Sequence, residues 1–220
     1  MTNPVIQLLV LAAIAIFLIL RLRSVLGTRE GFEKPPVPRS DPDASKARQK
    51  FEVIEGGPDR DITDHVAEDS AAASALAAMK KADPTFSVTE FLQGARGAYE
   101  MILMAFEKGD LEQIRSFLND DVYEAFASVV EARHAEGITI DATFVGISDL
   151  ALVAAEFDET TREGDVSVKF VGELTSVVRN AAGEVVEGSA TEIKRQRDIW
   201  TFARTMGSDD PNWLLVATGE

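Results

Sequence analysis

Three large aromatic residues near the C-terminus are the first candidates for a binding site. Trp200, Phe202 and Trp213 lie in two apolar segments that a turn-forming stretch, residues 208–211, separates. Aromatic side chains at the open end of a sheet can line a concavity that takes lipid or peptide. Side chains of this size also fill protein cores. The sequence leaves both interpretations open.

A short basic segment, Lys194, Arg195 and Arg197, contrasts with its surroundings, because residues 85–220 contain 11 basic and 25 acidic side chains. The three cations are candidates for contact with the carboxylates of a partner, or they form a solvated strand face. The whole chain has a formal net charge of −15. Such an acidic domain repels phosphate groups, so we expect no nucleic-acid partner and no direct docking on anionic lipid headgroups.

Residues able to act in catalysis are few. The chain has no cysteine, two histidines (His65 and His134) and two tyrosines (Tyr99 and Tyr123). General acid–base chemistry usually needs a histidine or carboxylate base beside a tyrosine or aspartate donor. Neither histidine is well placed to be a base, and no spacing of acidic residues is typical of a metal site. We predict a protein that is not an enzyme and has no cofactor, with an isomerase-like activity as the weakest alternative.

An apolar run near the N-terminus predicts a membrane segment. From Val5 to Leu20 every residue except Gln7 is apolar, and twelve of them are Val, Ile, Leu or Phe. Those twelve favour insertion into a bilayer by roughly 4 to 7 kcal/mol. We predict an anchor over residues 1–27, with residues 4–22 in contact with the lipid bilayer.

The charges beside this segment predict its orientation. Arg21 and Arg23 follow the apolar run, whereas no basic residue precedes it. The positive-inside rule then predicts a single-pass protein of a bacterial inner membrane, with a periplasmic N-terminus and a cytoplasmic C-terminal domain. A cleaved signal peptide is the alternative, although such peptides normally begin with basic residues.

Residues 28–82 have the composition of a flexible linker. Five prolines lie between Pro35 and Pro58, and apolar periodicity is almost absent up to residue 63. An alanine-rich stretch over residues 68–81 has acids at its start and two lysines at its end, which suits a short helix. This helix either packs on the domain that follows or becomes ordered when a partner binds.

The segment 83–220 has the pattern of one α+β domain. Ser87 and Glu90 form a capping box before a helix that ends at Gly109. Two further helices follow, up to Gly137. Beyond that glycine the apolar period changes from 3.6 to 2, which predicts four or five antiparallel strands with a bulge or bend at Gly146. We therefore expect three helices packed on a curved antiparallel sheet.

This order of elements resembles the cone-shaped fold of nuclear transport factor two. Within it, several segments resemble the C-terminal domain of the mitochondrial inner-membrane import subunit Tim forty-four, and the whole chain resembles its alphaproteobacterial relatives of the TimA adaptor type. The segments are Asp83, Pro84 and Phe86, then Ile114–Leu118, Arg197–Arg204 and Pro211–Leu215.

The resemblance implies a membrane-tethered, non-enzymatic adaptor that binds proteins at the cytoplasmic face of the inner membrane, in protein transport or envelope assembly. The mitochondrial relatives hold a chaperone beside an import channel and dock peripherally, whereas the apolar run of this chain predicts a spanning segment. The identity of its protein partners is therefore not implied. A lipid-binding or small-molecule-binding domain that uses the interior of the cone is the alternative.

Overall fold

The computed structural model describes residues 57–219, which belong to one compact unit. The predicted bilayer segment at residues 4–22, with Arg21 and Arg23, lies outside the described residues, as does the linker up to residue 56. Within 57–219, no helix combines the length and the apolar character that crossing a bilayer requires.

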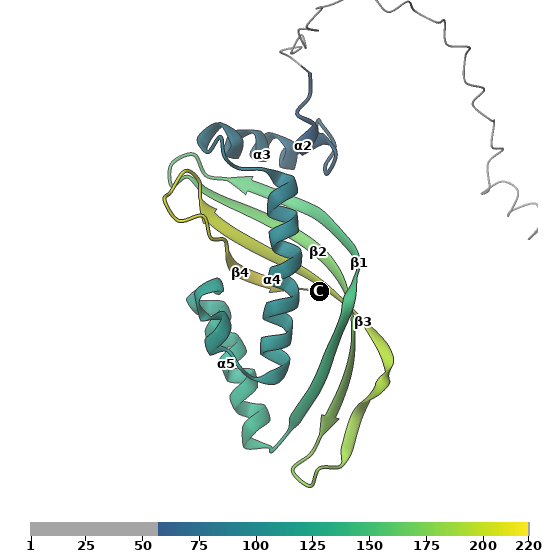
Figure 1. The fold of residues 1–220 in the computed structure, drawn as a ribbon. Coiled ribbons are helices and arrows are strands. Elements are labelled where there is room, and N and C mark those ends of the chain that lie inside the picture. Colours follow the sequence, from purple (N-terminus) through teal and green to yellow (C-terminus); the bar gives the residue numbers. More distant parts are fainter. Residues whose placement is uncertain (1–56, 220) are drawn as a thin grey trace, which may run out of the picture. The chain divides into compact units, whose positions relative to one another are not determined.

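Helices come first along the described chain and strands follow, which confirms the predicted α+β class (Figure 1). The strands form one antiparallel sheet in the order β1-β2-β3-β4. The helices are α2 (Arg60–Thr63), α3 (Ala71–Ala82), α4 (Val88–Lys108), the 3-10 helix η1 (Glu112–Phe117) and α5 (Asp120–Ala135), and the strands are β1 (Thr139–Phe157), β2 (Glu163–Arg179), β3 (Val185–Thr205) and β4 (Leu214–Gly219).

The longest helix, α4, has caps at both ends. The Ser87 hydroxyl accepts a hydrogen bond from the backbone N–H of Glu90 at 3.3 Å, so the predicted start is confirmed. The carboxylate of Asp61 in α2 accepts two more, from the backbone N–H groups of Val88 and Thr89 at 2.8 and 2.9 Å. At its other end, Gly109 takes the left-handed conformation, with φ of 74°, that a helix end of this type requires.

The alanine-rich helix α3 packs on the sheet, which was one of the two predicted alternatives. Its residues Leu76 and Met79 are fully buried, and Ile62 of α2 is 4% exposed in the same core. The Arg162 guanidinium, in the β1–β2 turn, donates to the carbonyl of Ala82 at 2.7 Å. The hydrophobic core thus includes residues that precede position 83.

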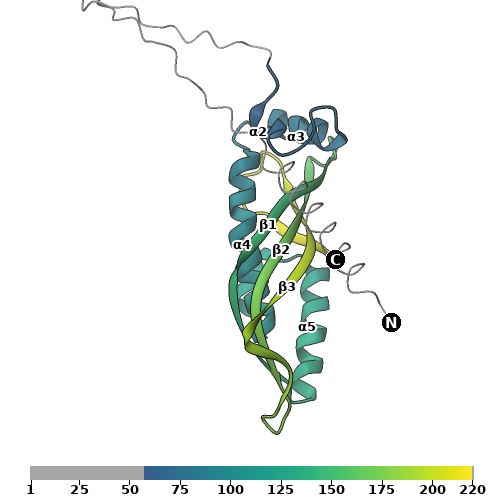
Figure 2. The ribbon, with the colours of Figure 1, turned by 90° about the vertical axis from the view of Figure 1, so that its right-hand side faces the viewer.

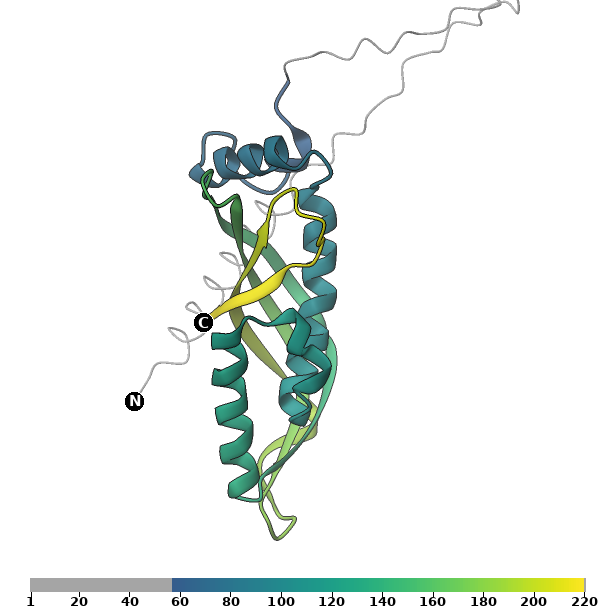
Figure 3. The ribbon, with the colours of Figure 1, turned by 90° about the vertical axis from the view of Figure 1, so that its left-hand side faces the viewer.

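The three long strands bend around α4 (Figures 1 and 2). The register of β1 against β2 shifts between Phe144 and Gly146, which confirms the predicted irregularity at Gly146. The short strand β4 pairs with the end of β3, from Ile199 to Ala203, and its Leu215 also forms a parallel bridge with Leu118. Figure 3 shows β4 beside the start of α5, where the backbone N–H of Asn119 donates to the carbonyl of Leu215 at 3.0 Å.

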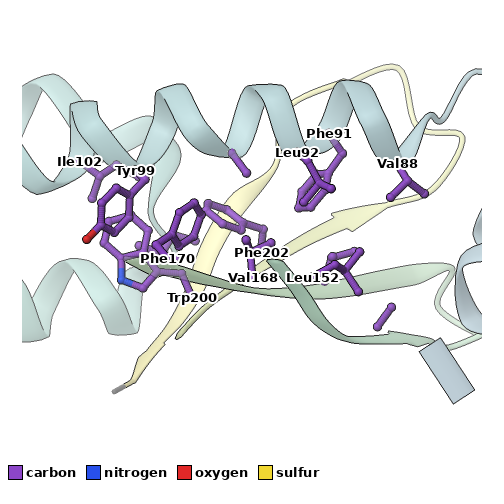
Figure 4. Close-up of a cluster of buried hydrophobic side chains, with 14 of the residues drawn as sticks. Val88, Phe91, Leu92, Tyr99, Ile102, Leu152, Val168, Phe170, Trp200 and Phe202 are labelled. Atoms are coloured by element: carbon purple, nitrogen blue, oxygen red, sulfur yellow. The ribbon is translucent and has the colours of Figure 1, made fainter. Parts of the chain in front are cut away.

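One face of α4 meets the inner face of the sheet to form the core (Figure 4). The apolar side chains of α4 recur at helical spacing, so they lie along a single side of the helix. They point toward alternate residues of β2 and β3, which share one face because side chains alternate along a strand. The labelled residues are Val88, Phe91, Leu92, Tyr99 and Ile102 of α4, with Leu152, Val168, Phe170, Trp200 and Phe202 of the strands.

Candidate functional site

An apolar groove of about 410 Å³ lies between the first half of α4, η1, the end of β3 and the segment that leads into β4. Its volume falls in the range of about 300–1,000 Å³ typical of small-molecule and side-chain pockets. Apolar side chains form most of its wall, and polar groups lie at its rim. The wall includes Phe86, Phe91, Ala98, Ile102, Phe117 and Trp213.

Trp213 is the central aromatic residue of the groove. Its ring centroid lies 4.6 Å from that of Phe91 and 5.7 Å from that of Phe86. Phe202 is 3% exposed and forms part of the floor, with its ring 5.9 Å from Phe91. Trp213 itself is only half-buried, so part of its ring remains free to contact a ligand.

Trp200, the third predicted binding residue, does not line the groove. Its side chain is 4% exposed and lies in the core, with its ring 4.7 Å from Tyr99 and 5.9 Å from Phe170. Of the three predicted aromatic residues, the structure therefore brings Phe202 and Trp213 to the groove and places Trp200 in the core.

A buried ion pair lies beside the groove. The Arg204 guanidinium, from the end of β3, binds the carboxylate of Asp83, which lies between α3 and α4. Their side chains are 11% and 9% exposed. The same guanidinium lies over the Trp213 ring, 5.2 Å from its centroid, which is the geometry of a cation–π interaction.

Asp83 is held by several donors besides Arg204. Thr85 donates its hydroxyl at 2.6 Å and its backbone N–H at 3.0 Å, and Gly207 donates its backbone N–H at 3.2 Å. The Thr85 hydroxyl lowers the pKa of Asp83 most; burial opposes the shift, and the backbone bonds and Arg204 add to it. Arg204 is thus a neutralised cation, and it orients Trp213 without giving the groove a free positive charge.

A second, partly buried polar contact joins α4 to β3. The Tyr99 hydroxyl donates to the carboxylate of Asp198 at 2.6 Å, and Gln196 donates to the other carboxylate oxygen at 3.1 Å. Burial, together with this bond to Asp198, raises the pKa of Tyr99. No local pattern in the sequence identifies Asp198 as the partner of Tyr99, because 99 residues separate the two in the chain.

The predicted basic residues do not form one patch. Lys194 pairs with Leu174, whose side chain is buried, so Lys194 lies on the inner side of the sheet, where its charge acts on Glu107 of α4. Arg195 lies opposite Glu173 and forms an ion pair with it at 2.8 Å. Because neighbouring side chains of a strand point to opposite faces, Arg195 and Arg197 lie on the outer side.

The two histidines lie outside the groove lining. His65 is in hydrogen-bonding contact with the Thr89 hydroxyl at 3.2 Å, and His134 is exposed in the last turn of α5. Within residues 57–219, the acidic and histidine side chains form no group of three or more that could hold a metal ion.

The sequence of this domain matches the family model described as "Tim44-like domain" over residues 72–220. The chain belongs to the Tim44-like domain family. The match begins inside α3 and includes every residue of the groove, so the groove is part of the family domain. The predicted family is therefore confirmed.

Curated relatives are mitochondrial import inner membrane translocase subunits. Human TIM44 is 26% identical over 145 residues, which cover 64% of this chain and 31% of that protein. TIM44-1 of Arabidopsis thaliana is 23% identical over 197 residues, which cover 84% of this chain and 40% of that protein. A probable subunit of Caenorhabditis elegans, tin-44, is 28% identical over 146 residues, which cover 64% of this chain and 34% of that protein. The chain thus spans between about a third and two fifths of these relatives.

Among solved structures, the intermembrane space region of the chloroplast protein ARC6 has a TM-score of 0.41 and 10% sequence identity. The likeness covers 58% of this chain and 94% of that one.

Proposed function

We propose that this protein is a membrane-tethered, non-enzymatic adaptor whose Tim44-like domain binds other proteins through the groove at Trp213. Family membership supports the adaptor role, because the curated relatives are subunits of an import translocase. The tether is residues 4–22, and Arg21 and Arg23 favour a cytoplasmic domain at a bacterial inner membrane. The proposal also assigns the chain to the alphaproteobacterial TimA type of the family and its domain to the cone-shaped fold of nuclear transport factor two.

The half-buried Trp213 is the observation that carries the proposal. Tryptophan, tyrosine and arginine dominate the energetics of protein interfaces when they lie in a pocket that excludes water. Here Trp213 rests on Phe86 and Phe91 and is fixed by Arg204, so a partner side chain meets a rigid aromatic surface. Binding to a preorganised surface loses little conformational entropy.

Charge indicates which protein segments suit the groove. Arg204 is neutralised by Asp83, whereas Glu90 at the rim is exposed. The domain around the groove is strongly acidic, as the excess of Asp and Glu over residues 85–220 shows. An apolar side chain flanked by lysine or arginine therefore fits better than an acidic segment.

A lipid or another small apolar molecule is the second candidate occupant. The volume of the groove, about 410 Å³, and its aromatic wall favour it. In this alternative, the same groove holds an acyl chain or a ring while the tether keeps the domain near the bilayer.

Cross-linking from the groove rim tests the proposal. The chain has no native cysteine, so Asn212→Cys, at the rim, gives one attachment point for a photoactivatable reagent on the full-length protein in membranes. We expect discrete protein adducts that decrease at least fivefold when Phe117→Ala removes part of the wall. The matched control is Leu214→Ala, because Leu214 is 38% exposed and lies outside the groove lining.

The outcomes separate the two candidates. Protein adducts that depend on Phe117 and not on Leu214 support the adaptor. Lipid that co-purifies with the protein and is lost in Phe117→Ala, without any protein adduct, supports the small-molecule alternative. Equal adducts in all variants contradict a role for the groove.

A further inference from the structure

The first turn of α4 takes part of its cap from α2, which lies beside it (Figures 1 and 3). The first N–H groups of an α-helix have no partner inside the helix. The Ser87 side chain satisfies the N–H of Glu90. The backbone N–H groups of Val88 and Thr89 instead donate to the carboxylate of Asp61, at 2.8 and 2.9 Å. The Ser87 hydroxyl also donates to Asp61, at 3.1 Å. Asp61 therefore holds three consecutive residues at the start of α4.

This start of α4 is also one wall of the groove. Phe86 and Ser87 both line it. The Phe86 ring lies 5.7 Å from that of Trp213 and 6.5 Å from that of Phe91. Because Phe86 directly precedes the Ser87 cap, any shift of the first turn of α4 moves Phe86 against Trp213. The carboxylate of Asp61 thus positions the wall on which Trp213 rests.

Asp61 is charged and is also held by a base. Lys80 of α3 binds Asp61 at 2.9 Å and Asp59 at 2.6 Å. Burial acts to raise the pKa of Asp61, but hydrogen bonds from Thr89 and Lys80 outweigh burial and bring the pKa well below its ordinary value of 3.8. A negative charge at the start of a helix is also favoured by the helix dipole. Both oxygens of Asp61 are therefore acceptors at neutral pH.

Few contacts keep α2 docked. Ile62 is the one buried residue among its four, and a single turn of helix is unstable by itself in water. The loop after it adds a contact from His65 to the Thr89 hydroxyl at 3.2 Å. The side chains of Asp61 and Lys80 are each 22% exposed, so solvent screens their ion pair in part. In contrast, α3 contributes fully buried side chains to the core. Elements with few buried contacts open locally at a small cost in free energy, so α2 can leave while α3 stays.

We propose that α2 is a releasable clamp on the groove. With α2 docked, Asp61 fixes the start of α4, and Phe86 supports Trp213. With α2 released, the first turn of α4 loses its Asp61 acceptor and the wall at Phe86 loosens. The inference rests on the proposed function, because the groove is the binding site that the clamp regulates.

The position of α2 in the chain gives the clamp its input. The described chain begins at residue 57, and α2 is its first element. A partner or a pull that acts on the residues before position 57 therefore reaches α2 before any other described element. The coupling is reciprocal: a ligand that binds only the ordered wall also stabilises the docked α2.

The fluorescence of Trp213 reports the state of the wall. The chain has two tryptophans, so Trp200→Phe leaves Trp213 as the only one. In that background, acrylamide quenching is measured on the full-length protein in detergent, with and without Asp61→Ala. We expect the quenching constant to rise roughly twofold in Asp61→Ala, because Phe86 no longer shields the ring. Asp61→Asn keeps one acceptor oxygen and should fall between the two.

Three further variants separate the clamp from other effects. Asp64→Ala is the matched control, because Asp64 is exposed at the end of α2 and its substitution removes the same charge but no bond between Asp61 and α4. It should leave the quenching constant unchanged. Ile62→Asp releases α2 by another route, since Ile62 is 4% exposed, and should raise the constant as much as Asp61→Ala.

Leu174→Ala is the third variant and tests for a general loss of stability. Leu174 is 2% exposed on β2 and lies outside the groove lining, so its truncation destabilises the domain without changing α2. It should not change the quenching constant. Circular dichroism during heating confirms that each variant is folded at the temperature of the measurement.

Two results of the quenching experiment would overturn the inference. The first is an equal quenching constant in Asp61→Ala and Asp64→Ala, which means that Asp61 has no role at the groove. The second is an equal rise in Leu174→Ala, which means that the effect of Asp61→Ala is a general loss of stability.

Cross-linking from Asn212→Cys separates the clamp from the proposed function. Protein adducts that are lost in Asp61→Ala and kept in Asp64→Ala support regulation by α2. Adducts that are kept in both contradict it. The absence of adducts in every variant contradicts the proposed function alone, because the quenching of Trp213 requires no partner and still decides whether α2 holds the wall.

Discussion

The two ends of the sheet differ in how they are held. At one end, α2 and α3 lie against the turns of the sheet, and Asp83 and Asp61 join these helices to Arg204 and to the start of α4. At the other end, the β2–β3 hairpin extends beyond α5 (Figure 1). There Val185 and Val186 are 54% and 58% exposed.

This difference indicates which part of the domain is rigid. Regions with many buried contacts open only with global unfolding, whereas regions with few open locally at a small cost in free energy. The groove lies at the well-packed end, so its aromatic surface is preorganised. The hairpin belongs to the end that opens first.

The largest effect should come from the ion pair beside the groove. Asp83→Ala leaves Arg204 buried without its carboxylate, and breaking such a pair costs about 3 kcal/mol. Urea denaturation of the full-length protein in detergent measures the free energy of unfolding. The control is Asp149→Ala, because its ion pair with Lys169 is half-exposed and should contribute less than about 1 kcal/mol.

The same pair predicts a pH dependence. The pKa of Asp83 lies below its ordinary value of 3.8 in the folded protein, chiefly because of the Thr85 hydroxyl. The folded state thus binds fewer protons than the unfolded state, and stability from this group is complete above pH 3.8 and is lost as pH falls below it. Asp83→Ala should therefore lose less stability than wild type on acidification. An unchanged acid dependence would contradict the assigned role.

At the groove end of the sheet, the sequence predicts contacts between neighbouring residues but not contacts between residues far apart in the chain. The cap at Ser87 and the end of α4 at Gly109 are set by neighbouring residues, and both were predicted. The pairing of Asp83 with Arg204 joins residues 121 positions apart. No local pattern indicates which acid meets which base over that distance, and the family segments contained both residues without pairing them.

The aromatic residues show a similar limit. Trp200 and Phe202 are two positions apart on β3, so the period of a strand places them on the same face. Strand periodicity does not predict which part of that face the helix α4 covers. That depends on η1 and on the turn before β4, so Trp200 became core and Trp213 became groove wall.

We expect an intermediate loss of unfolding free energy at the boundary between the two ends, where the Tyr99 side chain packs against Gly172 of β2. A Cβ atom at Gly172 would lie 2.6 Å from the Tyr99 hydroxyl oxygen, and no rotation of an alanine methyl relieves this. Gly172→Ala should cost about 2 kcal/mol of unfolding free energy by overpacking. Gly146→Ala is the matched control, because a Cβ atom there meets nothing within 4 Å.

A double mutant sharpens this prediction. Tyr99→Phe removes the atom nearest to the new methyl group, so Gly172→Ala should cost less in that background than in the wild type. If the two costs simply add, the close approach of Tyr99 to Gly172 is not the cause of the destabilisation.

The smallest effect should come from the hairpin, and it tests the comparison directly. Val186→Ala removes two methyl groups that already contact water, so the change in unfolding free energy should stay within about 0.5 kcal/mol. Val166→Ala makes the same change at a fully buried position of β2 near the groove and should cost about 2 kcal/mol. Hydrogen exchange measured on the same samples separates local from global opening. If the amides of the hairpin exchange as slowly as those around Val166, the two ends are equally stable, and the rigidity of the groove is not a special property of its end of the sheet.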